Sequence, residues 1–280
     1  MKELRSSLDS SVNFISDGFE ARYVRRYDHY FSCYLSSFKG CNKGCKMCFL
    51  TRDKQFSTVP ATNSHFLYQA RKVMCHYAAE EPRAETVHFN FMAKGDPLAN
   101  SHLDDDTLIM LGKLAKEFGL KSKFNISTIM PTKYPGELES RFSITSPTVY
   151  YSMYSVQPEF RDHWLPSAMP VVEAVERLES YQYHTKKIIK IHFAFIEGEN
   201  DRVEDVRAMC QLLKKHKLRV EFNVIAYNPP DELSRSTRPS EVANLMEIVR
   251  GIMSEETRVK YITRVGYDVA ASCGMFINLR

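Results

Sequence analysis

Hydrophobic residues along the chain follow two spacings, short apolar runs typical of buried strands and longer stretches with helical periodicity. Six strand-like runs are expected at residues 30–36, 86–93, 123–129, 148–155, 188–196 and 219–227. Amphipathic patterns predict helices at 63–80, 103–118, 168–183 and 201–217, a weaker one near 134–142, and another at 239–254. This alternation of strands and helices predicts a parallel sheet with right-handed crossovers.

The expected fold is therefore α/β, a partial TIM-like (β/α)6 barrel within a single domain. At 280 residues and 44% hydrophobic content the chain is long enough for one large core. We expect a β extension at residues 1–30, the barrel at 31–230, and a C-terminal extension at 231–280 that includes a short apolar run at 259–265. Ligand sites of such sheets lie at the C-terminal ends of the strands.

Charge and cysteine usage narrow the class of protein. The net charge of +4 permits a polyanionic partner without requiring one. The N-terminus has no apolar h-region, and no stretch reaches the roughly 18 unbroken apolar residues of a membrane span. These features predict a soluble, cytoplasmic protein without a membrane partner. Seven cysteines without a secretion signal indicate reduced thiols rather than a disulfide framework.

Three of the seven cysteines, Cys41, Cys45 and Cys48, fall within the stretch CNKGCKMC, shortly after the first expected strand of the barrel. Zinc normally takes four ligands, so Cys33 or a histidine would have to complete the set. Three thiolates instead suit an iron–sulfur cluster with one iron left open for substrate or cofactor. Unligated thiols so close together on a surface would oxidise readily. The spacing favours the iron–sulfur cluster over zinc.

In this strand–loop context, C-x₃-C-x₂-C resembles the radical S-adenosylmethionine superfamily. Further stretches narrow the likeness: SDGFEARYVRRYDHYFSCYLSSFKGC, FMAKGDPLAN (91–100), NISTIMP (125–131), YYSMYSVQPEFRDHWLP (150–166), VIAYNPP (224–230) and GYDVAASCGM (266–275). Their order and spacing are similar to those of the RlmN/Cfr family of radical enzymes that methylate RNA adenine. The resemblance runs from about Asp17 to Met275. It implies a barrel of the radical S-adenosylmethionine type, with a [4Fe-4S] cluster on Cys41, Cys45 and Cys48.

The resemblance also implies roles for residues outside the cluster loop. Cys273, in A-S-C-G, corresponds to the family's methyl-carrying cysteine, and Cys33 to the second mechanistic cysteine in the family's L-C-V-S-S stretch. Glu20, thirteen residues before Cys33, corresponds to a proton acceptor. The implied S-adenosylmethionine contacts, from the G-E-P, S-L-H and W-N-P motifs and the serine after the third strand, are Gly95, Asp96, Ser127, Ser152, Met153, Tyr154 and Asn228.

The implied reaction consumes two molecules of S-adenosylmethionine per turnover. One methylates Cys273, and a second yields a 5′-deoxyadenosyl radical that takes hydrogen from this methyl group. The methylene radical adds to the adenine ring, Cys33 or Glu20 removes the ring proton, and a disulfide between Cys33 and Cys273 releases the product. The expected substrate is an adenosine of rRNA or tRNA, at carbon-2 in preference to carbon-8. A monomer reduced by flavodoxin or ferredoxin is expected.

Two other functions remain open on the sequence alone. The first is a radical enzyme of the same fold with a substrate other than RNA, and the second is a zinc-stabilised nucleic-acid-binding protein without catalysis. Structural roles are also open for Glu20 as a strand-edge carboxylate and for Gly95 and Asn228 in turns. Cys75 and Cys210, on expected helices, are predicted to be small buried hydrophobic residues.

Several positions depart from the family. Asp96 replaces the glutamate of G-E-P, Tyr154 the histidine of S-L-H, and one extra residue separates Cys33 from Cys41. The N-terminal helical accessory domain of the family is expected to be lacking. Two interpretations remain open for the basic residues near the cysteine loop, which either belong to a solvated loop or contact phosphates. These residues are Lys39, Lys43, Lys46, Arg52 and Lys54. Tyr34, Phe38 and Phe49 are expected either to stack on bases or to pack internally.

Overall fold

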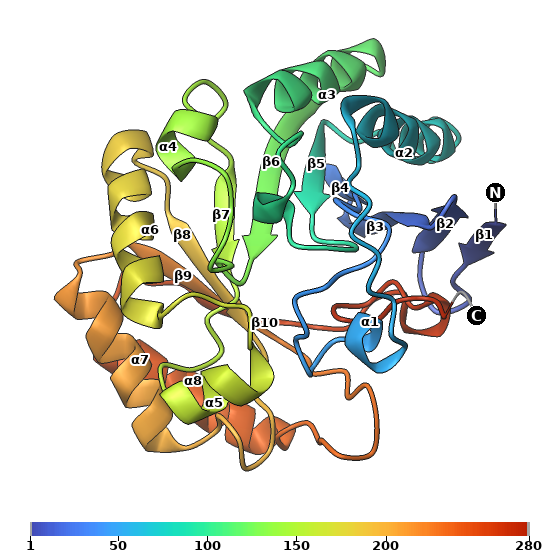
Figure 1. Cartoon of the computed structure of the whole chain (residues 1–280). Coiled ribbons are helices and arrows are strands. Elements are labelled where there is room, and N and C mark those ends of the chain that lie inside the picture. Colours follow the sequence, from blue (N-terminus) through green and yellow to red (C-terminus); the bar gives the residue numbers. More distant parts are fainter. Residues whose placement is uncertain (1, 279–280) are drawn as a thin grey trace.

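The computed structural model describes residues 2–278, whose strands form one sheet in chain order (Figure 1). At its N-terminal end, β1 (Lys2–Arg5), β2 (Val12–Ser16) and β3 (Phe19–Tyr27) pair antiparallel, and β3 pairs antiparallel with β4 (Tyr30–Tyr34). These strands extend the barrel sheet at the edge where the C-terminal segment also lies (Figure 1).

The rest of the sheet is parallel and curves into a partial barrel, which confirms the predicted fold class. After β4 it contains β5 (Thr86–Phe91), β6 (Lys121–Thr128), β7 (Thr148–Tyr151), β8 (Ile189–Phe193), β9 (Val220–Ile225) and β10 (Val259–Ile262). The six predicted strands are β4 to β9. The seventh, β10, comes from the short run at 259–265 that was assigned to the C-terminal extension, and it pairs in register with Phe222–Ile225 of β9.

Amphipathic helices cover the outside of the barrel (Figure 1). They are α2 (Asn63–Tyr77), α3 (Asp105–Glu117), α4 (Leu138–Arg141), α6 (Val171–Thr185), α7 (Val203–Lys215) and α8 (Pro239–Ile252), all at predicted positions. Two short helices were not predicted, α1 (Phe49–Arg52) and α5 (Pro158–Trp164). Cys210 is buried as expected, whereas Cys75 is exposed because α2 turns its other face to the core.

Strand alternation separates a hydrophobic outer face from a polar inner face of the barrel. On β5, Val87, Phe89 and Phe91 join the core under the helices, and His88 and Asn90 lie on the opposite face. Asn90 accepts a hydrogen bond from Asn125 of β6 over 2.7 Å. The barrel interior therefore offers hydrogen-bonding groups rather than a purely apolar cavity.

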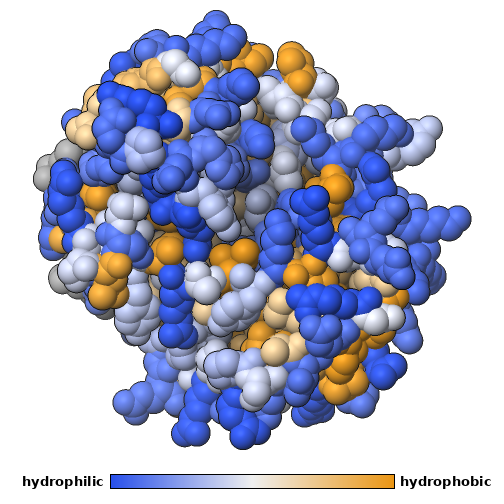
Figure 2. Space-filling model, turned by 180° about the vertical axis from the view of Figure 1, so that it is seen from behind, coloured by the Kyte–Doolittle hydropathy of each residue, from blue (hydrophilic) through white to orange (hydrophobic). Residues whose placement is uncertain are grey.

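The surface seen from behind is mostly hydrophilic, with hydrophobic side chains in scattered groups (Figure 2). Within residues 2–278, every helix is too short or too polar to cross a bilayer.

Candidate active site

The cysteine loop leaves the C-terminal end of β4 and ends in α1. Cys41, Cys45 and Cys48 line one pocket, and the backbone fixes the loop through Cys41 N–H donating to the Gln55 carbonyl at 2.9 Å and Cys48 N–H donating to the Cys45 carbonyl at 3.1 Å. Gly40 is required before the first cysteine, because a Cβ there would lie 2.3 Å from the Gln55 carbonyl oxygen. The local sequence thus holds the three thiols at one cavity.

These thiols are electrostatically coupled. Burial, together with the neighbouring Cys41 charge, raises the pKa of Cys48 to about 12, and burial followed by Cys41 and Cys48 raises the pKa of Cys45 well above its usual value. Without a cation the thiols therefore stay protonated, and a positive metal centre is what would make them thiolates. Among residues 2–278, no three His, Cys, Asp or Glu side chains are grouped tightly enough to hold a metal ion. The donor set nevertheless fits an iron–sulfur cluster, whose irons take thiolate ligands.

The loop after β5 forms another wall of the pocket that the three cysteines line. Gly95 has φ of +81°, and a Cβ at this position would lie 2.5 Å from Phe38 Cδ2, so only glycine fits. Asp96 is buried, and its carboxylate accepts hydrogen bonds from Leu98 N–H, Ile129 N–H and the Thr128 hydroxyl at 2.9–3.0 Å. Burial raises the pKa of Asp96, and these hydrogen bonds oppose the shift. Asp96 shapes the pocket by tying the turn after β5 to the end of β6.

Replacing Asp96 with asparagine is expected to lower the free energy of unfolding by about 2 kcal/mol, because the new amide turns a donor towards groups that themselves donate. Denaturant unfolding of the purified protein measures the change. Asp162→Asn, at an exposed site on α5, is the matched control and should leave stability within about 0.5 kcal/mol. Equal stability of the two variants would contradict the assigned role of Asp96.

The other predicted cofactor contacts differ in where their side chains lie. Ser127 and Ser152 line the cysteine pocket. Met153 does not, because its side chain is fully buried in the barrel core, so a direct contact with a ligand does not fit its placement. Tyr154 lies close enough to the cysteines that their charges, after burial, raise its pKa. Asn228 holds the C-terminal segment, donating to the Cys273 carbonyl at 2.8 Å and to Ser272 Oγ at 3.1 Å.

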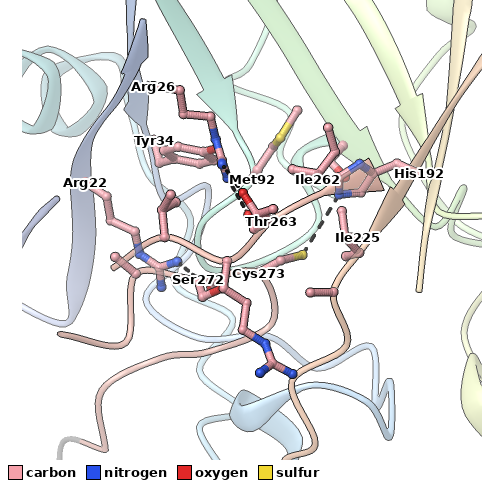
Figure 3. A pocket seen from close by; sticks show the side chains of 15 residues that line it. Arg22, Arg26, Tyr34, Met92, His192, Ile225, Ile262, Thr263, Ser272 and Cys273 are labelled. Atoms are coloured by element: carbon pink, nitrogen blue, oxygen red, sulfur yellow. Dashed lines mark hydrogen bonds between the residues drawn. The ribbon is translucent and has the colours of Figure 1, made fainter. Parts of the chain in front are cut away.

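Cys273 lines a second pocket (Figure 3), and this pocket adjoins the first. Met92 and Ser127 line both pockets, and the chain passes between them, with Cys273 lining one and Gly274 the other. The thiol is accessible from the pocket, yet the surrounding walls desolvate it and raise its pKa to about 11, against the opposing charge of Arg22. The structure thus brings the end of the chain into the barrel mouth.

Cys33 points away from this pocket, which corrects its predicted role. Its side chain has no exposed surface and packs in the core beneath the helices, in register with Tyr23 and Phe89 of the neighbouring strands. The next residue, Tyr34, faces the other side of β4 and lines the pocket of Cys273. Because adjacent strand residues face opposite ways, a disulfide between Cys33 and Cys273 would require β4 to turn over.

Glu20 is an anchor of the C-terminal segment rather than a free base. Its carboxylate is fully buried, lies 3.1 Å from Arg22 Nη2 and 3.2 Å from Lys94 Nζ, and accepts the backbone N–H of Ile277 at 3.1 Å. Arg22 donates in turn to the carbonyls of Ser272 and Met275. This buried ionic group therefore fixes the residues on both sides of Cys273.

Replacing Glu20 with glutamine is expected to reduce stability by about 3–5 kcal/mol, since Arg22 and Lys94 would remain buried without a counter-charge. Thermal or denaturant unfolding reads the loss, and Glu255→Gln at an exposed site is the control. A stable Glu20→Gln variant that has lost activity would contradict this assignment and restore the role of Glu20 as a proton acceptor.

Most charges predicted near the loop have internal partners. Lys39 pairs with Asp17 at 2.8 Å, Lys46 contacts His163, and Arg52 pairs with its neighbour Asp53. Two further residues of the site, Arg22 and His192, had no predicted role, whereas Tyr34 was expected to stack on bases or to pack internally and lines the pocket. His192 Nε2 lies 3.9 Å from Cys273 Sγ, although 81 positions separate them in the chain. Only the strand alternation of β8 indicates that His192 faces inward.

No family model matches the chain. Curated proteins do match over nearly its whole length: the probable dual-specificity RNA methyltransferase RlmN of Natranaerobius thermophilus is 24% identical, with 96% of this chain and 76% of the relative covered. A Clostridium botulinum RlmN is 28% identical over the same shares, and the ribosomal RNA large subunit methyltransferase Cfr of Lachnoclostridium phytofermentans is 25% identical, covering 87% and 69%. The chain is a homologue of the RlmN and Cfr methyltransferases.

A solved structure agrees with this homology at the level of fold. A radical SAM methyltransferase from Sphaerobacter thermophilus superposes with a TM-score of 0.80 at 17% identity, covering 98% of this chain and 80% of its own. In this RlmN/Cfr homologue, Ser36 and Ser37 correspond to the two serines of the family's L-C-V-S-S stretch, which aligns that stretch with residues 33–37. Tyr34, not Cys33, then occupies the family's cysteine position, in agreement with the face on which each side chain lies.

Proposed function

We propose that this protein is a radical S-adenosylmethionine enzyme that methylates a ring carbon of an adenosine in RNA, with Cys273 as the methyl carrier. Carbon-2 is the proposed position, and rRNA or tRNA the proposed substrate. The homology to RNA methyltransferases supports the reaction class.

One structural observation carries the proposal. The three-cysteine pocket and the Cys273 pocket adjoin, and the consecutive residues Cys273 and Gly274 line one each. Gly274 is also tied to the cluster loop, since its carbonyl accepts the backbone N–H of Phe49 at 3.0 Å. A group carried on Cys273 is therefore held between a site suited to cluster and cofactor and a site open to substrate.

The walls of the Cys273 pocket suit a nucleotide. Arg26 and Arg264 line it together with the ring of Tyr34, and guanidinium groups and aromatic rings are the usual partners of RNA phosphates and unstacked bases. Arg264 also lies over the ring of Tyr267, which is itself half-exposed. This combination favours RNA over an uncharged small molecule as the substrate.

Each residue then has a defined task. When bound, the cluster and S-adenosylmethionine supply the methyl group and the carbon-centred radical. Cys41, Cys45 and Cys48 would hold the cluster, and Gly95 and Asp96 line the wall of the same pocket, where the cofactor would bind. Cys273 would accept the methyl group on its sulfur. The hydrogen bonds from Arg22 and to Glu20 hold the backbone on both sides of Cys273 and so keep that sulfur in position. Two cofactor molecules per turnover and a reduced electron donor such as flavodoxin or ferredoxin belong to the proposal.

Nucleoside analysis tests this function. RNA from cells with and without the protein is digested, and methylated adenosines are separated by liquid chromatography and identified by mass spectrometry. A methyladenosine that appears only with the active protein supports the proposal. Cleavage of S-adenosylmethionine without any change in RNA nucleosides would instead point to a substrate other than RNA.

A further inference from the structure

Cys273 has one nitrogen base beside its sulfur. His192 projects from the inner face of β8 into the pocket, and its Nε2 lies 3.9 Å from Cys273 Sγ, within the range of a hydrogen bond to sulfur (Figure 3). The other ring nitrogen, Nδ1, is buried and has no hydrogen-bond partner within residues 2–278. The ring is held edge to face against Tyr150, with centroids 5.7 Å apart. The imidazole is therefore fixed with one nitrogen directed at the thiol.

We propose that His192 accepts the thiol proton of Cys273 when the sulfur is alkylated. This role rests on the proposed function, in which Cys273 takes up a methyl group, and assigns the proton that this step must release. The S–H bond breaks as the new S–C bond forms, and the proton moves to Nε2. The bond between the methyl carbon and the donor sulfonium breaks, with its electron pair remaining on the donor sulfur.

The charges around the pair make such an acceptor necessary. Burial lowers the pKa of His192 to about 4, while the pKa of Cys273 is raised to about 11, so both groups are neutral over the physiological range. The thiol is consequently a weak nucleophile unless its proton is removed during the reaction. As the S–C bond forms, the S–H group becomes strongly acidic, and transfer to a nearby neutral imidazole becomes favourable.

The other polar groups facing this pair do not replace the imidazole. Tyr34 faces Cys273 with a phenol whose pKa is raised by burial, and Tyr150 is shifted in the same direction. The cationic neighbours cannot accept a proton, and the ion pair beneath His192 already joins β8 to β9. The cations that line the pocket are Arg22, Arg26 and Arg264, and the ion pair is Lys190 with Glu221.

The pH dependence of Cys273 alkylation tests the proposal. The cluster-loaded protein is treated anaerobically with iodoacetamide, a neutral electrophile, and modification of the Cys273 peptide is followed by mass spectrometry between pH 6 and pH 9. With His192 as acceptor the rate should change by less than about tenfold across this range, because thiol and neutral imidazole both persist. In His192→Gln the rate should follow the thiolate fraction and rise about tenfold for each unit of increasing pH.

His184→Gln, at an exposed position in the last turn of α6, is the matched control and should keep the flat wild-type profile. Thermal unfolding checks that His192→Gln is folded. A wild-type rate that already rises tenfold for each unit of increasing pH, or a flat profile that survives in His192→Gln, overturns the proposal.

The same preparations separate this proposal from the proposed function. After incubation with S-adenosylmethionine, the mass of the Cys273 peptide is measured. A His192-dependent flat profile without methylation of Cys273 supports His192 as proton acceptor and contradicts the carrier role. Methylation of Cys273 at equal rates in wild type and His192→Gln, each rising tenfold per pH unit, supports the carrier role and overturns the role of His192.

Discussion

Cys273→Ala is expected to lower RNA methylation by about a thousandfold or more, because it removes the atom proposed to carry the methyl group. Cleavage of S-adenosylmethionine should continue, since the cluster ligands are on a different loop and line a different pocket. Both quantities are measured in one anaerobic assay, by nucleoside analysis of the RNA and by quantifying 5′-deoxyadenosine.

Cys33→Ala is the matched control for this experiment. Cys33 packs in the core, so the substitution should cost about 1 kcal/mol of stability through the lost sulfur and leave methylation within about twofold of wild type. Loss of methylation in a folded Cys33→Ala protein would contradict its placement away from the pocket. Full activity of Cys273→Ala would contradict the carrier role.

Replacing any one of Cys41, Cys45 and Cys48 with serine is expected to abolish both cofactor cleavage and RNA methylation. A serine hydroxyl is a poor ligand for the irons of such a cluster, and transfer of the carbon from Cys273 to RNA depends on the radical that the loaded site would supply. After anaerobic reconstitution with iron and sulfide, iron content and visible absorbance report the cluster, and 5′-deoxyadenosine reports cleavage.

Cys75→Ser serves as the control because Cys75 is exposed on the outer face of α2. It should bind iron and cleave S-adenosylmethionine like the wild type. A triple variant of the loop that keeps its iron and its cleavage activity would show that the cluster is held elsewhere. A colourless wild-type protein that retains stoichiometric zinc would instead favour the nucleic-acid-binding alternative.

Most of the fold could be predicted from the sequence because strands and helices leave local patterns of hydrophobic residues. Alternating apolar runs and helical periodicity place the parallel strands and their covering helices, and the loop after the first barrel strand identifies the three cysteines. Such patterns do not predict short helices and strands. The helix Pro158–Trp164 and the last strand Val259–Ile262 each span only about two periods of their pattern, too few to identify them, and the strand is defined by pairing with β9.

The site could be predicted less completely, because it depends on which face of a strand each side chain occupies and on contacts between residues far apart in the sequence. Cys33 and Tyr34 are adjacent, and a one-residue change of register exchanges which of them faces the pocket. The contact between His192 and Cys273 and the bond between Glu20 and Ile277 join residues far apart in sequence. Only the folded chain brings these groups together. The sequence predicted that Cys33 and Cys273 lie side by side, whereas in the structure Cys273 lies beside the imidazole of His192 and the phenol of Tyr34.

The most direct test of the proposed function is RNA methylation by the reconstituted enzyme with isotopically labelled S-adenosylmethionine. The protein, loaded with iron and sulfide, is incubated anaerobically with a chemical reductant, rRNA or tRNA from cells that lack the protein, and S-adenosylmethionine with a deuterated methyl group. We expect a labelled methyladenosine that is absent with Cys273→Ala, and label on the Cys273 peptide of the wild type. Efficient cleavage of S-adenosylmethionine with no labelled adenosine and no label on Cys273 would contradict the proposed function.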